Sequence, residues 1–217
     1  MWNLTHLRSV FPVLFVAAIA TVVSCDGLAT NPKHKSTGGD GDAGSTGGAG
    51  GTGGSSTGGA GGGAEPAPVL PTVTDADLQS CVDEINRYRD TLKLRHYTRS
   101  SALEDCAKKA ADSDSKTHKV HNYAATTTCP GGRTGQNAAY GWQGWTIEDW
   151  GSIQEIMKGS LKMMWNEGPD NGDGKDHGHY ELMSSTGKAA AVTSVGCGVA
   201  VVWEGGKTQV TVVMDFK

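Results

Sequence analysis

The chain has 217 residues, of which 19 are basic and 23 acidic, and its formal net charge is −4 at pH 7. It contains no basic patch with interleaved aromatic residues, so the sequence argues against nucleic acid as a partner. Glycine is unevenly distributed, because residues 38–63 hold 15 of the 32 glycines. This bias separates a low-complexity segment from a compositionally ordinary C-terminal part.

The first 24 residues are predicted to be a signal peptide. Arg8 provides a positive start, and the run from Val10 to Val23 is almost wholly apolar. This run is too short for a retained transmembrane helix, which favours a cleaved leader. The segment from Val22 to Cys25 resembles a bacterial lipobox, in which the cysteine is lipidated. We therefore expect lipid on Cys25 and an extracytoplasmic protein anchored to the membrane of the cell envelope. Ordinary cleavage nearby, which leaves Cys25 free, is the alternative.

Residues 25–71 are predicted to be the lipidated cysteine followed by a flexible Gly/Ser-rich tether. The segment repeats a unit like STGGAGG and shows no apolar periodicity. Such a composition cannot bury enough surface to offset the entropy lost on ordering. A flexible coil of this length reaches about 40 Å. The tether therefore sets a distance from the membrane and carries no chemistry.

The remaining residues, 72–217, fit one domain with a sizeable core. Apart from Cys25, the chain has four cysteines, all of them in this domain. In an exported domain, four cysteines usually form two disulfides, and the sequence alone leaves three connectivities open. The disulfide candidates are Cys81, Cys106, Cys129 and Cys197.

Three helices are predicted in the first two thirds of the domain. Thr74 can cap the first, which has an apolar stripe at helical spacing. The second opens with the capping-box pattern of Ser101 and Glu104, and Ser152 opens the third in the same way. The third is expected to end at Gly168-Pro169. The stripe of the first helix consists of Leu78, Val82, Ile85 and Leu92.

The end of the domain is rich in β-forming residues. Val195–Trp203 and Thr208–Phe216 are predicted to be strands joined by a hairpin turn that contains two glycines. A further strand is expected at Gln136–Tyr140, and His179–Met183 is expected to be extended. Helices precede and interleave with these strands. The predicted class is α+β, a three-layer α-β-α sandwich around a small antiparallel sheet.

Two histidines, His177 and His179, stand two residues apart in the last third of the chain. In an extended segment, residues at this spacing share one face, so both imidazoles would point the same way. Histidine is a common metal ligand and an acid–base group near neutral pH. An isolated pair of this kind is more often part of a polar turn, so the pair alone does not define a site.

Five short motifs follow one another in a characteristic order. They are Asn86-Arg87-Tyr88-Arg89, Gly135-Gln136-Asn137-Ala138, Trp165-Asn166-Glu167, Gly178-His179-Tyr180 and Val195-Gly196-Cys197. Together they resemble the CAP superfamily of cysteine-rich secretory proteins, insect venom antigens and plant pathogenesis-related proteins. Each motif alone is weak, but five in this order at compatible separations are specific. The resemblance covers residues 75–217 and implies a CAP-like domain, which the lipobox-like segment would place in a bacterial lipoprotein.

The resemblance implies a central cleft lined by two histidines and two acidic residues. His179 is the second histidine, and Glu167 is the glutamate at the end of the third helix. His118 and His121 both qualify as the first histidine, and the asparagine that follows it favours His121. Gln136 stands where the family has its other glutamate. An amide can neither act as a general base nor add negative charge.

The cleft residues also suit a divalent metal, with zinc as the expected ion. The predicted ligands are His121, His179 and Glu167, and His177 and His118 are further candidates. Because Gln136 adds no charge, metal binding is expected to be weak.

The sequence favours a monomeric, membrane-tethered binding module that takes a lipid, a sterol or a protein in its cleft. A hydrolase is the second interpretation, using metal-bound water or a histidine with Glu167. No nucleophile elbow and no HExxH motif supports it. A structural or adhesion protein with a vestigial cleft is the third. The sequence assigns no catalytic residue.

Overall fold

The computed structural model describes residues 68–217, except for the side chain of Lys188. The predicted signal peptide, the lipidation of Cys25 and nearly all of the tether lie outside the described residues. Within residues 68–217, no helix is long and apolar enough to cross a membrane.

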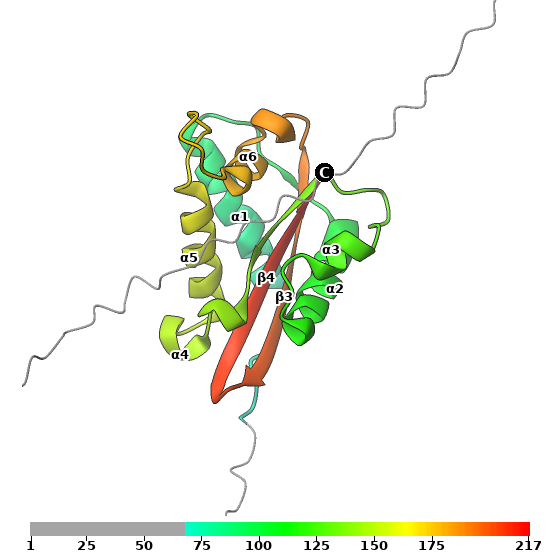
Figure 1. Ribbon diagram of the computed structural model, residues 1–217, viewed down its shortest axis with the longest axis vertical. Coiled ribbons are helices and arrows are strands. Elements are labelled where there is room, and N and C mark those ends of the chain that lie inside the picture. The colour runs from blue at the N-terminus through cyan, green and yellow to red at the C-terminus, as the bar shows by residue number, and fades with distance from the viewer. Residues whose placement is uncertain (1–67) are drawn as a thin grey trace, which may run out of the picture.

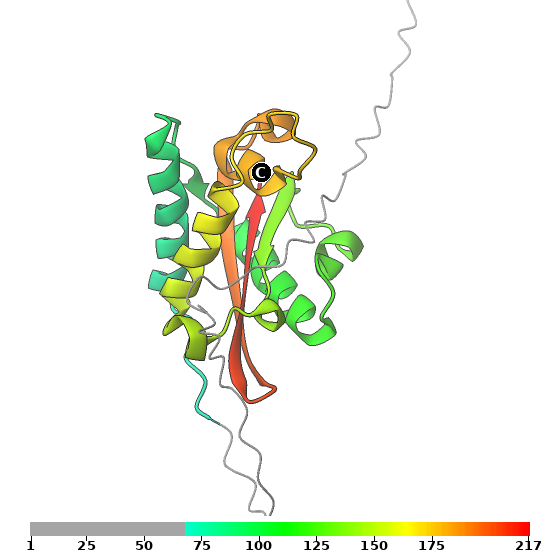
Figure 2. The same cartoon turned by 60° about the vertical axis from the view of Figure 1, so that its left-hand side comes forward.

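A four-stranded sheet lies between two layers of helices (Figures 1 and 2). Helices α1 (Asp75–Thr91) and α5 (Ile153–Trp165) cover one face. Helix α2 (Ser101–Thr117) covers the other face, with the short α3 (Asn122–Thr126) beside it. This arrangement confirms the predicted α+β class and its three layers.

The strand order in the sheet is β1-β3-β4-β2. Strands β3 (Ser194–Glu204) and β4 (Lys207–Phe216) form the predicted hairpin, and β2 (Gly135–Ala139) pairs antiparallel with the end of β4. Strand β1 (Thr98–Arg99), however, pairs with β3 in parallel. The sheet is therefore mixed, and the prediction of an antiparallel sheet was wrong in this respect. A two-residue strand is too short to leave an alternating pattern in the sequence.

The alternation of side chains along β3 explains how closely α2 packs on the sheet. The odd-numbered residues from Val195 to Val199 are buried in the core cluster that also contains side chains of α1 and α5. Gly196 and Gly198 face α2, and a Cβ on Gly198 would overlap the backbone of that helix at Lys108. The two glycines therefore let the backbone of α2 approach the strand directly, which any larger residue would prevent.

The helix starts follow capping chemistry, with one shift in position. Thr74 caps α1 in a complete capping box, and Ser152 caps α5, both as predicted. Helix α2 is capped by Ser100, whose side chain accepts from the backbone of the third helical residue. The prediction that Ser101 is the cap was wrong by one residue, because Ser101 already belongs to the helix.

The expectation that His179–Met183 is extended was wrong, because these residues lie in a short helix, α6 (Gly178–Ser184). Figure 1 shows α6 above the sheet, near the C-terminal end of β4. A third short helix, α4 (Ile147–Trp150), and two 3₁₀ segments, η1 (Gly141–Gln143) and η2 (Gly187–Ala189), complete the described elements. Helices α4 and α6 have four and seven residues, and each 3₁₀ segment has three. All of them are shorter than two helical turns, which is too short for a periodic signal in the sequence.

Both disulfides expected from the four cysteines are present. Cys81 of α1 is bonded to Cys197 of β3, and Cys106 of α2 is bonded to Cys129 in the segment before β2. The first bond ties one helical layer to the sheet. The second ties α2 to the segment that leads from α3 to β2.

Candidate functional site

A cavity of about 680 Å³ lies beside α3, β2 and α6. One part of its lining comes from residues 121–136, and the rest comes from residues 170–189. Its polar lining residues include two buried histidines, His121 and His177, together with Gln136, Arg133 and Glu181. A cavity of this size is within the range that small-molecule sites occupy.

His121 reaches this cavity because the chain turns sharply between α2 and α3. It is the residue before α3, with a left-handed backbone (φ 51°). Its backbone N–H donates to the hydroxyl of Tyr140 at 2.7 Å, and its Nδ1 lies 2.8 Å from Oε1 of Gln136. The ring is almost fully buried.

His118, the other candidate for the first histidine, lies elsewhere. It caps the C-terminus of α2, and its Nε2 lies 2.8 Å from a carboxylate oxygen of Glu204 at the end of β3. Its ring packs against Trp142, with centroids 5.1 Å apart, and its side chain is 42% exposed. Of the two candidates for the first histidine, His121 lines the cavity and His118 does not.

Gln136 connects His121 to a buried carboxylate that the sequence analysis did not single out. Its Nε2 donates to Oδ1 of Asp215 at 2.8 Å. Arg133 lies on the other side of Asp215, with its Nη1 3.3 Å from the same oxygen. Burial raises the pKa of Asp215, while Arg133 and the bond from Gln136 act in the opposite direction. Arg133 is itself held by a 2.8 Å bond from Nη2 to the carbonyl of Ala124.

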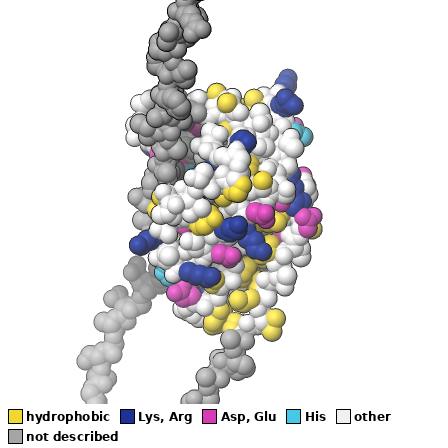
Figure 3. All heavy atoms as spheres, turned by 90° about the vertical axis from the view of Figure 1, so that its right-hand side faces the viewer, with side chains coloured by type: hydrophobic (Ala, Val, Ile, Leu, Met, Phe, Trp, Pro, Cys, Tyr) yellow, Lys and Arg dark blue, Asp and Glu magenta, His cyan; other side chains and the backbone are white. Residues whose placement is uncertain are grey.

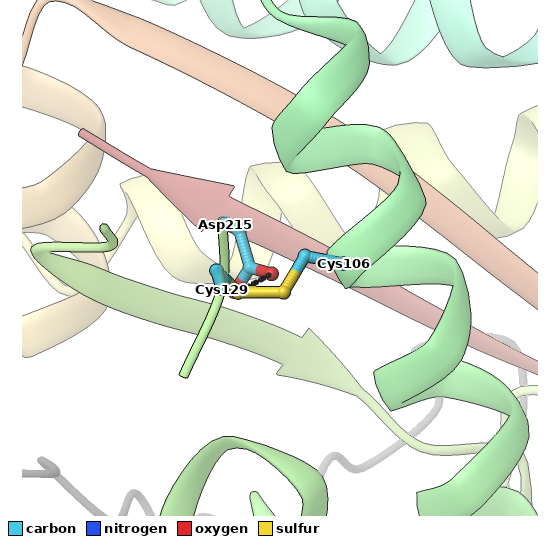
Figure 4. A group of neighbouring side chains, drawn as sticks. All are labelled: Cys106, Cys129 and Asp215. Carbon is cyan, nitrogen blue, oxygen red and sulfur yellow. Dashed lines mark hydrogen bonds between the residues drawn. A yellow bond between two sulfur atoms is a disulfide. The ribbon is translucent and has the colours of Figure 1, made fainter. Parts of the chain in front are cut away.

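Asp215 also lies beside the disulfide between Cys106 and Cys129 (Figure 4). Within residues 68–217, no other group of three or more histidine, cysteine or acidic side chains has its ligand atoms within 4.8 Å of one another. Because both sulfurs are bonded to each other, no thiolate is present to hold a metal. The group is therefore a structural contact.

The two histidines of the HxH segment do not share a face. The segment is not extended here, because His177 is the residue before α6 and His179 lies within that helix, and the two rings have different partners. Nδ1 of His179 lies 2.5 Å from Oε1 of Glu167. Nδ1 of His177 lies 2.9 Å from the carbonyl of Glu167, and its Nε2 lies 3.0 Å from Oδ1 of Asp173. The bond to Asp173 raises the pKa of His177.

Glu167 was expected in the last helical turn, but α5 ends at Trp165 with Asn166 as its cap. Glu167 is therefore just outside the helix. Its carboxylate holds His179 through one oxygen and is 3.4 Å from the backbone N–H of Tyr180 through the other. The side chain thus fixes the start of α6 as well as the ring of His179.

The predicted cleft residues thus form two hydrogen-bonded groups. The first joins His121 and Gln136, to which the unpredicted Asp215 is added from β4, and the second joins Glu167 and His179. Asn137, next to Gln136, donates from its amide to the carbonyl of His179 at 3.1 Å and so links β2 to α6. Glu167 and His179 are not among the residues that line the cavity, and His177 is. The predicted ligands His121, His179 and Glu167 do not bring their ligand atoms within 4.8 Å of one another.

Asp215 could have been found from the sequence by its pattern. It interrupts an apolar strand, and a charged residue in a central, fully buried strand is rare unless it has a partner. The sequence did not identify that partner, because Arg133 and Gln136 are about 80 residues away along the chain.

A family model described as "CAP: Cysteine-rich secretory protein family" matches residues 82–216. Among curated proteins, no match was found. Among solved structures, BmVAL-1 matches with 18% identity and a TM-score of 0.47, over 68% of this chain and 81% of that chain. Na-ASP-1 matches with 14% identity and a TM-score of 0.44, over 69% and 41%. Venom allergen-like protein 4 of Schistosoma mansoni matches with 14% identity and a TM-score of 0.39, over 67% and 91%.

Proposed function

The chain belongs to the CAP, or cysteine-rich secretory protein, family, and on this basis we propose that it is an extracytoplasmic binding module. The cavity of about 680 Å³ beside His121 and α6 is the single observation that carries this proposal. Its mixed polar and apolar lining suits a small amphipathic ligand such as a lipid or sterol. The two disulfides support an oxidising compartment.

The charge distribution on the surface around α2 and α3 favours a charged macromolecular partner less than the cavity favours a small molecule. On the uncovered part of the face in Figure 3, acidic and basic side chains are interspersed. Such a surface has no extended field of one sign to steer a partner. The cavity is therefore the part of the domain on which we base the function.

Zinc is the ion that we propose for two buried imidazoles, that of His121, which lines the cavity, and that of His179, whose carbonyl is linked to β2 through Asn137. In each ring, Nδ1 faces an oxygen acceptor, which is Gln136 for His121 and Glu167 for His179. In a metal-binding histidine, the ring nitrogen that does not bind the metal commonly donates its N–H to such an acceptor, which fixes the tautomer. Glu167 would then orient His179 and not bind the ion directly. With two protein ligands, water or a ligand completes the coordination, and the binding is weak.

Zinc titration by calorimetry tests this part of the proposal. At pH 7.5 the purified chain should bind one zinc ion, and His121→Ala or His179→Ala should each weaken binding at least tenfold, because each removes one of two protein ligands. His118→Ala is the matched control, since His118 is exposed and paired with Glu204. Equal loss in the control, or no loss in either His121→Ala or His179→Ala, would contradict the site.

We propose in addition that Cys25 carries the lipid that tethers the module to the membrane. The lipobox-like segment supports this, and a lipid anchor would hold a ligand-binding domain at the source of a membrane ligand. Cells grown with labelled fatty acid should label the wild-type chain, and Cys25→Ala should remove the label. Label that persists at an unchanged level in the variant would exclude Cys25 as the attachment site.

A further inference from the structure

Position 136 holds an amide, which brings no charge to His121, but the structure places a carboxylate directly behind that amide. Gln136 and Asp215 are register partners across β2 and β4, and their side chains meet at 2.8 Å. On the other side of β4, the partner of Asp215 is Gly196, which has no side chain. The sheet itself therefore fixes the distance between the amide and the carboxylate.

The chemistry of the three groups determines how the amide is oriented. Burial raises the pKa of Asp215, whereas the guanidinium of Arg133 at 3.3 Å and the bond from Gln136 favour its ionised form. An ionised carboxylate only accepts hydrogen bonds. The NH₂ group of Gln136 must therefore face Asp215. Its carbonyl oxygen then faces Nδ1 of His121, and an oxygen there can only accept. The reverse orientation would place two acceptors against each other at Asp215.

We propose that Asp215 is a positioning residue for His121 and acts through Gln136. It holds the amide so that Nδ1 of His121 carries the proton and Nε2 carries the lone pair. Nε2 is then the atom that ligates zinc or accepts a hydrogen bond from a bound ligand. The proposal deepens the proposed function, since it states how His121 is prepared for binding. The carboxylate that position 136 lacks is supplied from β4.

The single substitution Gln136→Glu would place a second carboxylate next to Asp215. The new carboxylate would lie beside that of Asp215, which is fully buried, and two like charges so close together repel strongly. Moving the charge, by combining Gln136→Glu with Asp215→Asn, avoids this repulsion. The combined variant keeps one carboxylate and one amide, with their places exchanged.

The test is nitrogen NMR of the imidazole rings in metal-free, ¹⁵N-histidine-labelled chain at a pH where the rings are neutral. The wild type should show His121 almost wholly in the form with the proton on Nδ1. Asp215→Asn should shift the ratio of the two neutral forms about tenfold toward the form with the proton on Nε2, because the amide is no longer held in one orientation. The combined variant should restore the wild-type form.

Asp173→Asn is the matched control, because Asp173 contacts His177 and not His121. If Asp215→Asn does not fold, Gln136→Leu removes the acceptor at Nδ1 and should shift the same ratio. An unchanged His121 spectrum in a folded Asp215→Asn or Gln136→Leu variant would overturn the proposal. Because no metal is present, this outcome is independent of zinc.

In the zinc titration, Asp215→Asn should weaken zinc binding about tenfold. A wild-type chain that has the predicted tautomer but does not bind zinc would refute the zinc site alone.

Discussion

Replacing Cys81 and Cys197 together by alanine should lower the free energy of unfolding by about 2–5 kcal/mol. The bond closes a loop with a sequence separation of 116 residues, so it restricts the unfolded chain strongly. Both cysteines are fully buried, and the bond joins α1 to the middle of β3. Removing the two sulfurs therefore also leaves a gap in the main core. Denaturant unfolding of the oxidised protein measures the loss.

The matched comparison is the double variant of the other disulfide. Cys106 and Cys129 are separated by only 23 residues, so the loop-closure contribution is about 1.4 kcal/mol smaller. If the Cys81 and Cys197 variant loses less than the Cys106 and Cys129 variant, the ordering by loop length and core burial is wrong.

Asp114→Asn should make the protein about 2–3 kcal/mol more stable at pH 7.5. Asp114 lies on the inner face of α2 and is fully buried. One of its oxygens accepts from the backbone N–H of Tyr123 at 3.0 Å, and the other has no hydrogen-bond partner among the described residues. Burial raises the pKa of Asp114 to about 6, and the nearby charge of Asp215 adds to this effect. An amide of the same shape cannot ionise.

The pH dependence follows from the direction of this shift. Between pH 4 and pH 6, the folded state holds a proton on Asp114 that the unfolded chain has already released. The contribution of Asp114 to stability is therefore present at pH 4 and is lost as the pH rises through about 6. The gap between Asp114→Asn and wild type should be small at pH 4 and fully developed by pH 7. Unfolding midpoints measured across this range would refute the assignment if the gap were the same at every pH.

Features that depend on neighbouring residues were predictable from the sequence. Thr74 and Ser152 cap their helices because capping needs only a side chain and the next helical turn. The hairpin turn at Gly205 and Gly206 was predictable for the same reason, since both residues need a positive φ that glycine adopts freely. Leu92 shows the limit of periodicity, because it continues the apolar stripe in the sequence but is 47% exposed at the end of α1.

Features that depend on long-range contacts were not predictable. The segment around His179 has no periodicity to mark a helix of seven residues, and α6 is fixed by Glu167 and Asn137 from other parts of the chain. The same reason applies to the site. The sequence identified His121 and Gln136 through the family resemblance, but only the register between β2 and β4 shows that Asp215 stands behind Gln136.

The location of bound zinc is the most direct test of the zinc site proposed at His121 and His179. Zinc added to ¹⁵N-histidine-labelled chain should shift or broaden the imidazole signals of His121 and His179 together, with saturation at one ion per chain. The exposed His96 and His118, which pair with Asp90 and Glu204, should keep their signals unchanged. Signal changes confined to His96 or His118 would contradict a zinc site at His121 and His179. Zinc binding that is unchanged after both His121 and His179 are replaced by alanine would contradict it as well.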